Sequence, residues 1–171
     1  MLSNVTRYRA QGGESVLADF DVVPEVDALS LSEVHAAALA FWERKRGGRR
    51  APSRAEISPA EMKPWLHWVM LTEVHEGSPL RFRRRLVGTG ITGAVRRDVT
   101  GKYFEQIYEG ETLLHMQREY ARCANDWSPT LFHGGTPTRE GFTYNSILLP
   151  LSDDGRRVNM VLSVSQFLVK Y

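Results

Sequence analysis

Apolar positions in the first third of the chain recur with the period of an α-helix. Between residues 31 and 46 they fall about 3.6 positions apart, which predicts an amphipathic helix. Ser30 and Glu33 have the spacing of a capping box at its start, and Gly47-Gly48 predicts its end. The apolar stripe consists of Leu31, Val34, Ala38, Phe41 and Trp42.

Further along, helical and strand-like patterns follow in a fixed order. The strand-like runs are residues 65–75, 80–87, 130–133, 142–151 and 158–169, and residues 111–125 repeat the helical period. Turn residues separate the strands, most clearly Glu76 to Pro79 and Asp154-Gly155. Short helical turns are expected between Gly88 and Gly101. This order predicts an α+β domain with an antiparallel sheet.

Residues 1–28 show no sustained period. They contain Gly12-Gly13 and Pro24, and residues 16–23 suggest a short strand or turn. We therefore expect a flexible N-terminal arm, followed by a single domain over residues 29–171.

The basic residues are unevenly distributed. The net charge is only +2, yet residues 44–54 hold six Lys and Arg, and residues 44–102 hold fourteen bases against five acids. Arg44, Lys45 and Arg46 fall in the last turn of the predicted helix, where positive charge suits the helix dipole. The nearby Trp42, Trp65 and Trp68 follow core patterns, so they are not available to stack on bases. Nucleic-acid binding is not expected.

A single cysteine, Cys123, excludes an internal disulfide and fits a reducing compartment. No apolar run approaches the roughly 18 residues that a membrane span needs, and the N-terminus lacks a signal-peptide core. No metal-binding or catalytic motif is present. A cytoplasmic protein without a catalytic site is the expectation.

Four segments occur in the order of a known family. They read FWERKRGGRRAPSRAEISP, FRRRLVGTGI, RRDVTGKYF and LLPLSDDGRRV, and they resemble the short stand-alone PAS-domain proteins of alphaproteobacteria. Arg96 departs from the family pattern, which has glycine there. The motif positions of main interest are Trp42, Arg46, Gly47, Gly48, Arg49, Pro52, Arg54, Gly88, Thr89, Asp98, Gly101, Asp154 and Gly155.

This resemblance implies a PAS fold: a five-stranded antiparallel sheet in the order 2-1-5-4-3, helices on one face and an N-terminal flanking helix over residues 31–46. It also implies a cytoplasmic sensory or adaptor module that is not an enzyme and has no output domain of its own. Such a module would signal through a protein partner, such as a kinase or regulator. The alternative is a small α+β enzyme that uses an enclosed pocket for acid–base chemistry.

Cofactor chemistry finds little support in the chain. His115 falls on the helix face opposite the apolar stripe, so it is expected in solvent rather than as a haem ligand. Cys123 lacks the motif of flavin photosensors and is expected in the core. His67, His75 and His133 are interpreted as scattered residues. No cofactor is predicted.

Arg84 is the most informative candidate for a site. Alternation in its strand places Phe82, Arg84 and Leu86 on one inward face, and a buried arginine needs a partner. Three interpretations remain open: an internal acid, a bulge or sheet edge that exposes the side chain, or a small anionic ligand. The candidate acids are Glu73, Asp98 and Glu105. The predicted ligand pocket contains Arg84, Phe82, Tyr120 and Met116.

The flanking helix also has two possible roles. It could form a homodimer through its apolar stripe, or bury that stripe on its own sheet. In either case, Arg49 and Arg54 are expected to pair with local carboxylates or carbonyls and to fix how the helix docks.

Overall fold

A computed structural model describes residues 6–8, 20–23, 31–135 and 142–169. Four α-helices occur in this part of the chain, together with short 3-10 turns at Arg54–Glu56 (η2) and Leu66–Trp68 (η3). The helices are α1 (Glu33–Arg46), α2 (Thr89–Val95), α3 (Phe104–Ile107) and α4 (Gly110–Asp126). The strands are β1 (Thr6–Tyr8), β2 (Phe20–Val23), β3 (Val69–His75), β4 (Arg81–Val87), β5 (Thr130–Gly135), β6 (Phe142–Leu151) and β7 (Met160–Val169).

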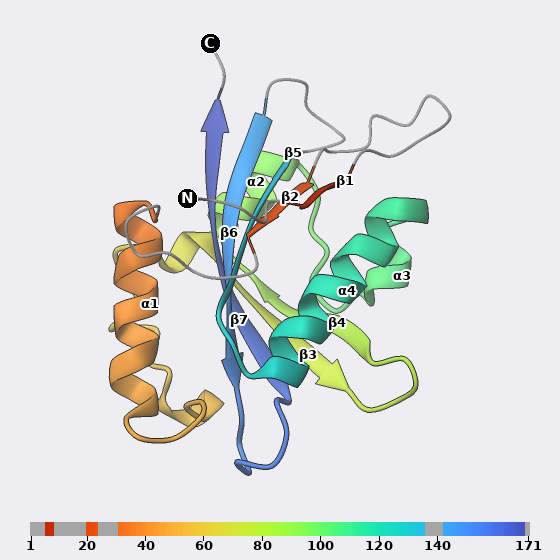
Figure 1. Cartoon of the computed structure of the whole chain (residues 1–171). Helices are drawn as coiled ribbons and strands as arrows, with labels where there is room; N and C mark the ends of the chain where they lie inside the picture. Colours follow the sequence, from red (N-terminus) through yellow and green to blue (C-terminus); the bar gives the residue numbers. More distant parts are fainter. Residues whose placement is uncertain (1–5, 9–19, 24–30, 136–141, 170–171) are drawn as a thin grey trace.

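The strands form one antiparallel sheet in the order β1-β2-β5-β6-β7-β3-β4 (Figure 1). If β3 to β7 are numbered 1 to 5 along the chain, they lie side by side in the predicted order 2-1-5-4-3. β1 and β2 extend the sheet beyond β5, which the predicted five-stranded sheet did not include. They come from the predicted N-terminal arm, and the prediction that this arm is flexible concerns mainly residues outside the described part.

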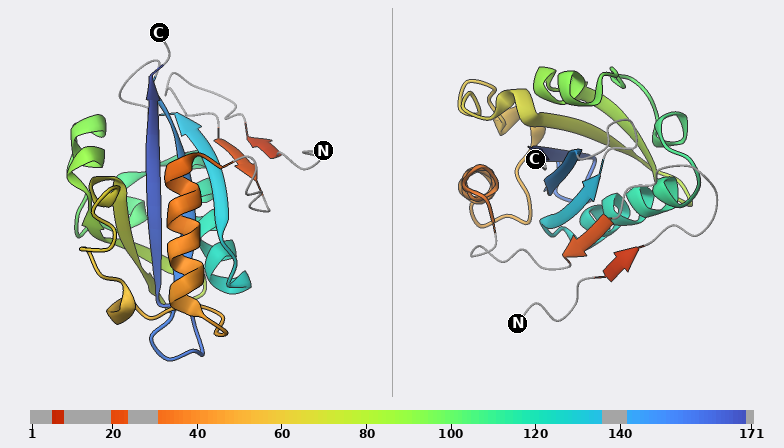
Figure 2. Two further views of the ribbon diagram at one scale, coloured as in Figure 1. Left: turned by 90° about the vertical axis from the view of Figure 1, so that its left-hand side faces the viewer. Right: turned by 90° about the horizontal axis from the view of Figure 1, so that it is seen from above.

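Helices cover both faces of the sheet, and each face has its own core. Seen from above, α1 and α4 lie on opposite sides of β6 and β7 (Figure 2). On the α1 side, Phe41 and Trp42 pack on Leu149 and Leu162. The stripe of α1 is therefore buried within its own chain, as the second of the two predicted roles proposed. Leu31 and Val34 of the stripe are only partly buried.

α1 begins at Glu33, two residues later than the predicted start at residue 31. Ser32 is the N-cap, and its hydroxyl accepts from the His35 amide at 3.2 Å. The capping box at Ser30 and Glu33 is therefore wrong, because Glu33 is the first helical residue and Ser30 lies outside the described part. The predicted end is confirmed, since Gly47 has a φ of +57° and donates to the Glu43 carbonyl at 3.3 Å.

Two strand predictions need correction. Trp65 and the turn η3 (Leu66–Trp68) replace the predicted start of a strand at residue 65, so β3 begins at Val69. The pairing of β3 with β4 also shifts between Leu71 and Thr72, whose partners are Leu86 and Arg84. This bulge interrupts the alternation, so Phe82 and Arg84 are buried while Leu86 is 40% exposed.

Candidate functional site

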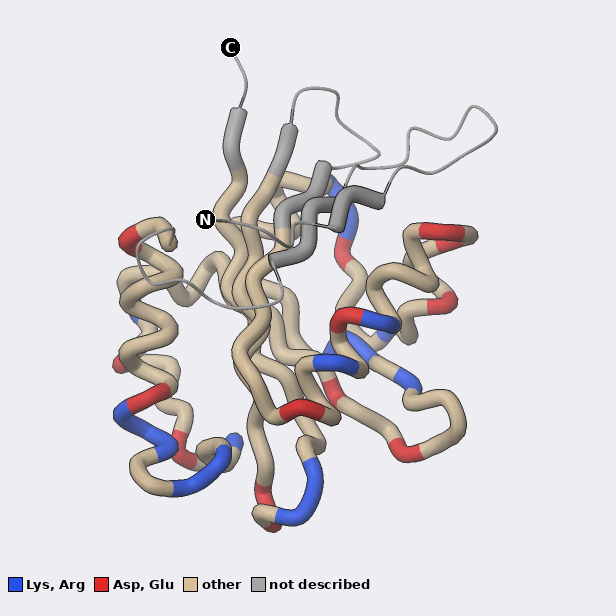
Figure 3. Tube along the Cα trace, in the orientation of Figure 1, with Lys and Arg blue, Asp and Glu red and all other residues tan. Residues whose placement is uncertain are grey.

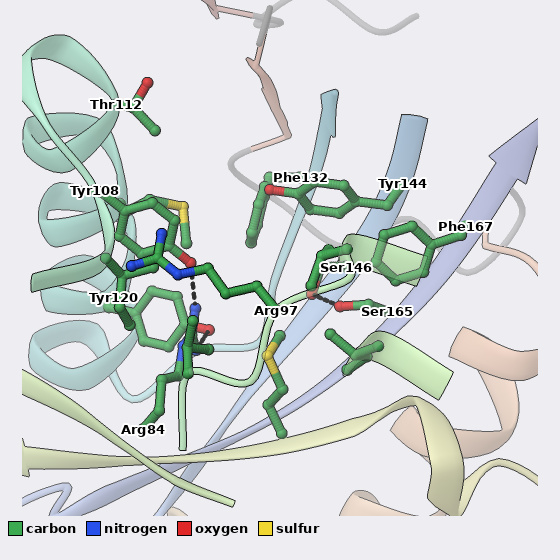
Figure 4. A pocket seen from close by; sticks show the side chains of 16 residues that line it. Arg84, Arg97, Tyr108, Thr112, Tyr120, Phe132, Tyr144, Ser146, Ser165 and Phe167 are labelled. Carbon is green, nitrogen blue, oxygen red and sulfur yellow. Dashed lines mark hydrogen bonds between the residues drawn. The ribbon is translucent and has the colours of Figure 1, made fainter. Parts of the chain in front are cut away.

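A cavity of about 160 Å³ lies between the sheet and the helices α2–α4 (Figure 4). Each of the five strands β3–β7 contributes at least one side chain to it, and α2, α4 and the segment after α2 close it. Most of the lining is apolar. The described lining residues are Met70, Arg84, Ile91, Val95, Arg97, Val99, Ile107, Tyr108, Thr112, Met116, Tyr120, Phe132, Tyr144, Ser146, Ser165 and Phe167.

Arg84 is a charged side chain inside this cavity wall, with only 1% of its surface exposed. Its Nη1 donates to the hydroxyl groups of Thr72 and Tyr120, both at 2.7 Å, and Nη2 donates to the Tyr108 hydroxyl at 2.8 Å. The guanidinium also lies over the Phe104 ring, 4.6 Å from its centroid. Burial opposes the charge, but the phenol oxygens of Tyr108 and Tyr120 outweigh it and raise the pKa of Arg84.

None of the three acids expected to pair with Arg84 does so. Glu73 accepts from His75 at 2.9 Å and lies beside Arg83 and Arg85, while Glu105 pairs with Arg81. Asp98 accepts from the amide of Thr100 at 2.9 Å. The internal-acid interpretation is wrong for these residues, and Arg84 forms no ion pair with any carboxylate in the described part of the chain.

Other polar groups occupy defined places around the cavity. The hydroxyls of Ser146 and Ser165 form a hydrogen bond of 3.0 Å on the sheet, drawn as a dashed line in Figure 4. Burial, followed by Tyr108 and Tyr120, raises the pKa of Tyr144, so its phenol stays protonated. Arg97 is exposed, and in Figure 4 its side chain extends toward the end of the cavity where Tyr108 and Tyr120 lie. The cavity thus combines an apolar body with a polar, cationic end.

Three of the four residues of the predicted pocket line this cavity: Arg84, Met116 and Tyr120. Phe82 lies behind them, with its ring 5.7 Å from that of Tyr120. Sequence reasoning missed Tyr108 and did not assign Arg97 to the pocket. Ser146 and Ser165 carried a usable signal, because each is a polar residue within an apolar strand.

The expected solvent exposure of His115 is wrong. Its side chain is only 3% exposed and lies edge-on to Phe132, with 6.5 Å between the ring centroids. The buried face of α4 is wider than the apolar stripe and also includes Thr112 and Glu119. Burial, assisted by Arg118, lowers the pKa of His115 to about 4, so the ring is neutral at neutral pH. His115 is not among the described residues that line the cavity.

The remaining candidates for redox or acid–base chemistry lie apart from the cavity. Cys123 of α4 is fully buried in the core, as expected. Burial raises the pKa of its thiol. His67 is exposed and His75 pairs with Glu73, while the His133 side chain lies outside the described residues. No group of three or more His, Cys, Asp or Glu residues in the described part could hold a metal ion.

The basic stretch after α1 connects this helix to the sheet. Figure 3 shows its Lys and Arg residues at the end of α1 and in the following loop. Trp42 is 2% exposed and donates from Nε1 to the Pro150 carbonyl on β6 at 2.7 Å. Arg46 lies over the Trp42 ring and donates to Glu43 at 2.7 Å. The helix is thereby attached directly to the sheet.

Arg49 and Arg54 pair locally, as predicted. Arg49 donates through Nη1 and Nη2 to both carboxylate oxygens of Glu56, at 3.0 and 2.6 Å. The Arg54 side chain donates to the Ile57 carbonyl at 3.0 Å, and its amide donates to Asp153 at 3.0 Å. The Pro52 carbonyl accepts from the Ser152 amide at 2.9 Å. The bonds from Arg54 to Asp153 and from Ser152 to Pro52 join the loop to the hairpin between β6 and β7.

Other motif residues shape turns. Gly88 precedes Thr89, the first residue of α2, and a Cβ there would lie 2.3 Å from the His67 carbonyl oxygen. Gly101 has a φ of +81°, and its amide donates to the Arg84 carbonyl at 2.6 Å. Arg96, which replaces the family's glycine, adopts a left-handed φ of +55°. The turn keeps a conformation that glycine adopts more readily.

The hairpin motif has a similar explanation. The Asp154 carboxylate accepts from the amides of Arg156 and Arg157, at 2.8 and 3.1 Å. Gly155 has a φ of +71°. Asp154 and Gly155 together close this turn. Asp153, in the same turn, accepts the hydrogen bond from the Arg54 amide.

The Arg49–Glu56 pair predicts a specific pH dependence of stability. The hydrogen bond from Arg49 lowers the pKa of Glu56 from 4.5 to about 2. A depressed carboxylate pKa stabilises the fold above about pH 4.5, and this contribution is lost as the pH falls toward about 2. The Glu56→Gln variant should therefore have a lower melting temperature than the wild type at neutral pH. This difference should narrow as the pH falls from about 4.5 toward about 2.

Thermal unfolding across that pH range measures the gap. The matched comparison is Arg49→Gln, in which the difference in melting temperature between Glu and Gln at position 56 should be smaller, because only the hydrogen bonds from Ser53 to residue 56 remain. A gap that persists unchanged into acid would exclude the assigned role of this pair.

The fold and the cavity define an α+β domain whose sheet and helices enclose an internal site. The chain belongs to the PAS domain family, since the model of that family matches residues 31–164. Comparisons with curated proteins and with solved structures find no match. No helix in the described part of the chain is long and apolar enough to span a membrane.

Proposed function

We propose that this chain is a cytoplasmic PAS sensory module that binds a small molecule in the cavity and signals through a protein partner. The observation that carries this proposal is the cavity itself: an apolar space of about 160 Å³ with a few polar anchors at one end. Such a composition is typical of sites that bind rather than transform a ligand. The family motifs support a place among the short stand-alone PAS proteins of alphaproteobacteria.

The alternative, an acid–base enzyme, requires a titratable pair in the pocket. The described lining contains no Asp, Glu, His or Cys residue, and these residues most often supply such a pair. This composition favours the sensory role. We also propose that the module uses neither haem nor flavin, because His115 and Cys123 lie outside the described cavity lining.

A signal could leave the cavity through the elements that cover it. Ile91 and Val95 of α2 line the cavity, as do Arg97 and Val99 of the following segment. A ligand that contacts this cover would favour one of its positions and so shift the population of states that a partner recognises. The partner would be a signalling kinase or regulator, or a second copy of the chain.

A cavity-filling variant tests the proposal. Val95→Phe adds an apolar ring to the cavity wall, and Ala94→Phe is the matched control because Ala94 is not among the described lining residues. Binding of single-ring and short-chain fragments is measured by ligand-observed NMR. We expect fragments to bind the wild type and the control but not Val95→Phe. No binding to the wild type, or equal binding to Val95→Phe, would overturn the proposal.

A further inference from the structure

Arg84 places a permanent charge in the cavity wall that the sensory role alone does not require. The side chain is 1% exposed, and its hydrogen bonds in the described part of the chain go to hydroxyl groups. Burial of a charge is costly unless an opposite charge or a full set of hydrogen bonds compensates it. The described residues supply neither in full.

The number of N–H donors on Arg84 shows which of them lack an acceptor. A guanidinium has five N–H donors. Both donors of Nη1 are used, by Thr72 and Tyr120, and one donor of Nη2 is used by Tyr108. Nε has no hydrogen-bond partner among the described residues. One donor on Nε and one on Nη2 therefore remain, and guanidinium donors match the two oxygens of a carboxylate.

Arg97 adds a second positive charge to the cavity. Its Nη2 donates a long hydrogen bond of 3.4 Å to the Gln106 carbonyl, and Arg97 forms no ion pair with a carboxylate of the described residues. Because Arg97 is exposed, its charge attracts anions from solvent as well as those inside the cavity.

The size and lining of the cavity define the rest of the ligand. An apolar cavity of roughly 150 Å³ holds one benzene-sized molecule, and this cavity has about 160 Å³. Away from the arginines it is lined mainly by apolar side chains such as Ile91, Val95 and Phe167. An inorganic anion would leave this surface unfilled.

We infer that the cavity binds a small organic carboxylate, with the carboxylate at Arg84 and Arg97 and a single ring or short chain against the apolar lining. The inference rests on the proposed function, which it deepens by naming the class of ligand. The carboxylate would supply the negative charge and the acceptors that the described surroundings of Arg84 lack.

Matched pairs of charged and neutral probes test the inference. Isothermal titration calorimetry compares benzoate with benzamide and hexanoate with hexanamide, and uses inorganic phosphate to detect binding of any anion. Hydrogen bonds to a charged group favour the carboxylates, so each should bind about tenfold or more tightly than its amide. Phosphate should bind more weakly than benzoate.

Three variants test which residues cause the preference for carboxylates. Arg84→Met replaces the guanidinium by an uncharged, unbranched side chain and should abolish the preference for carboxylates. Arg97→Gln, at an exposed position where folding is not at risk, should weaken benzoate binding about threefold or more, with a smaller dependence on salt. Arg96→Gln is the control, because this neighbouring exposed arginine is not among the described lining residues.

The outcomes separate this inference from the proposed function. Amides that bind the wild type as tightly as carboxylates, or a carboxylate preference that survives Arg84→Met, would overturn the inference and leave the sensory role standing. If phosphate binds as tightly as benzoate, the inference that the ligand needs an apolar ring or chain is wrong. Failure of all these probes would also overturn the inference, while the fragment comparison with Val95→Phe decides the sensory role separately.

Discussion

Trp42→Ala should lower the free energy of unfolding by about 3–5 kcal/mol, the cost expected for removing a buried large aromatic side chain. The indole is 2% exposed and packs in the core between α1 and the sheet. The substitution also removes the buried hydrogen bond from the indole to the Pro150 carbonyl. Urea unfolding followed by circular dichroism measures the difference.

Two further variants separate packing from hydrogen bonding. Trp42→Phe keeps an aromatic ring but loses the donor, so it should cost less than Trp42→Ala. Arg44→Ala lies on an exposed position of the same helix and should change stability by less than about 0.5 kcal/mol. A cost for Trp42→Ala no greater than that of Arg44→Ala would mean that α1 is not docked through Trp42.

Gly88→Ala should have the second large effect, at the upper end of the cost of about 1–3 kcal/mol expected for overpacking. Its added Cβ would lie 2.3 Å from the His67 carbonyl oxygen and 2.9 Å from that of Val69. Both contacts are with backbone atoms, so the junction of β4 with α2 must move. The free energy of unfolding from urea titration measures the cost.

Gly93→Ala provides the matched control in the same short helix. A Cβ at Gly93 meets no atom within 4 Å, and alanine favours a helix over glycine by about 1 kcal/mol. This variant should therefore be stabilised. Equal effects of the two substitutions would mean that the backbone approach at Gly88 does not constrain the fold.

Much of the fold follows from local patterns that the sequence displays directly. Gly47 ends α1 as predicted, and the turn at Asp154-Gly155 lies in the hairpin of two apolar strands. The start of α1 was less predictable because both Ser30 and Ser32 are good caps. The strands β1 and β2 were also missed as parts of the sheet, since three or four residues carry too little periodic signal.

The candidate site was predictable only in part. Alternation placed Phe82 and Arg84 inward, but the bulge that exposes Leu86 depends on pairing with β3. The partners of Arg84 include Tyr108 and Tyr120, which are 24 and 36 residues away in the chain. Periodicity cannot identify such contacts, because they depend on how α4 lies across the sheet.

His115 illustrates the limit of reading one helix in isolation. Its position opposite the apolar stripe of α4 indicated solvent, yet Phe132 of β5 packs against it. A helical pattern reports which residues are apolar, whereas burial also depends on what lies beside the helix. Polar residues such as Glu119 can therefore be buried as well.

The nitrogen Nε of Arg84 offers the most direct test of the account. Spectra of ¹⁵N-labelled arginine side chains follow its N–H resonance, which Arg84→Met identifies by its absence. We predict that benzoate moves this resonance saturably and that benzamide does not, because only the carboxylate engages the unpaired donor. An Arg84 resonance that stays fixed at saturating benzoate would contradict the claim that this cavity is the site of anion recognition.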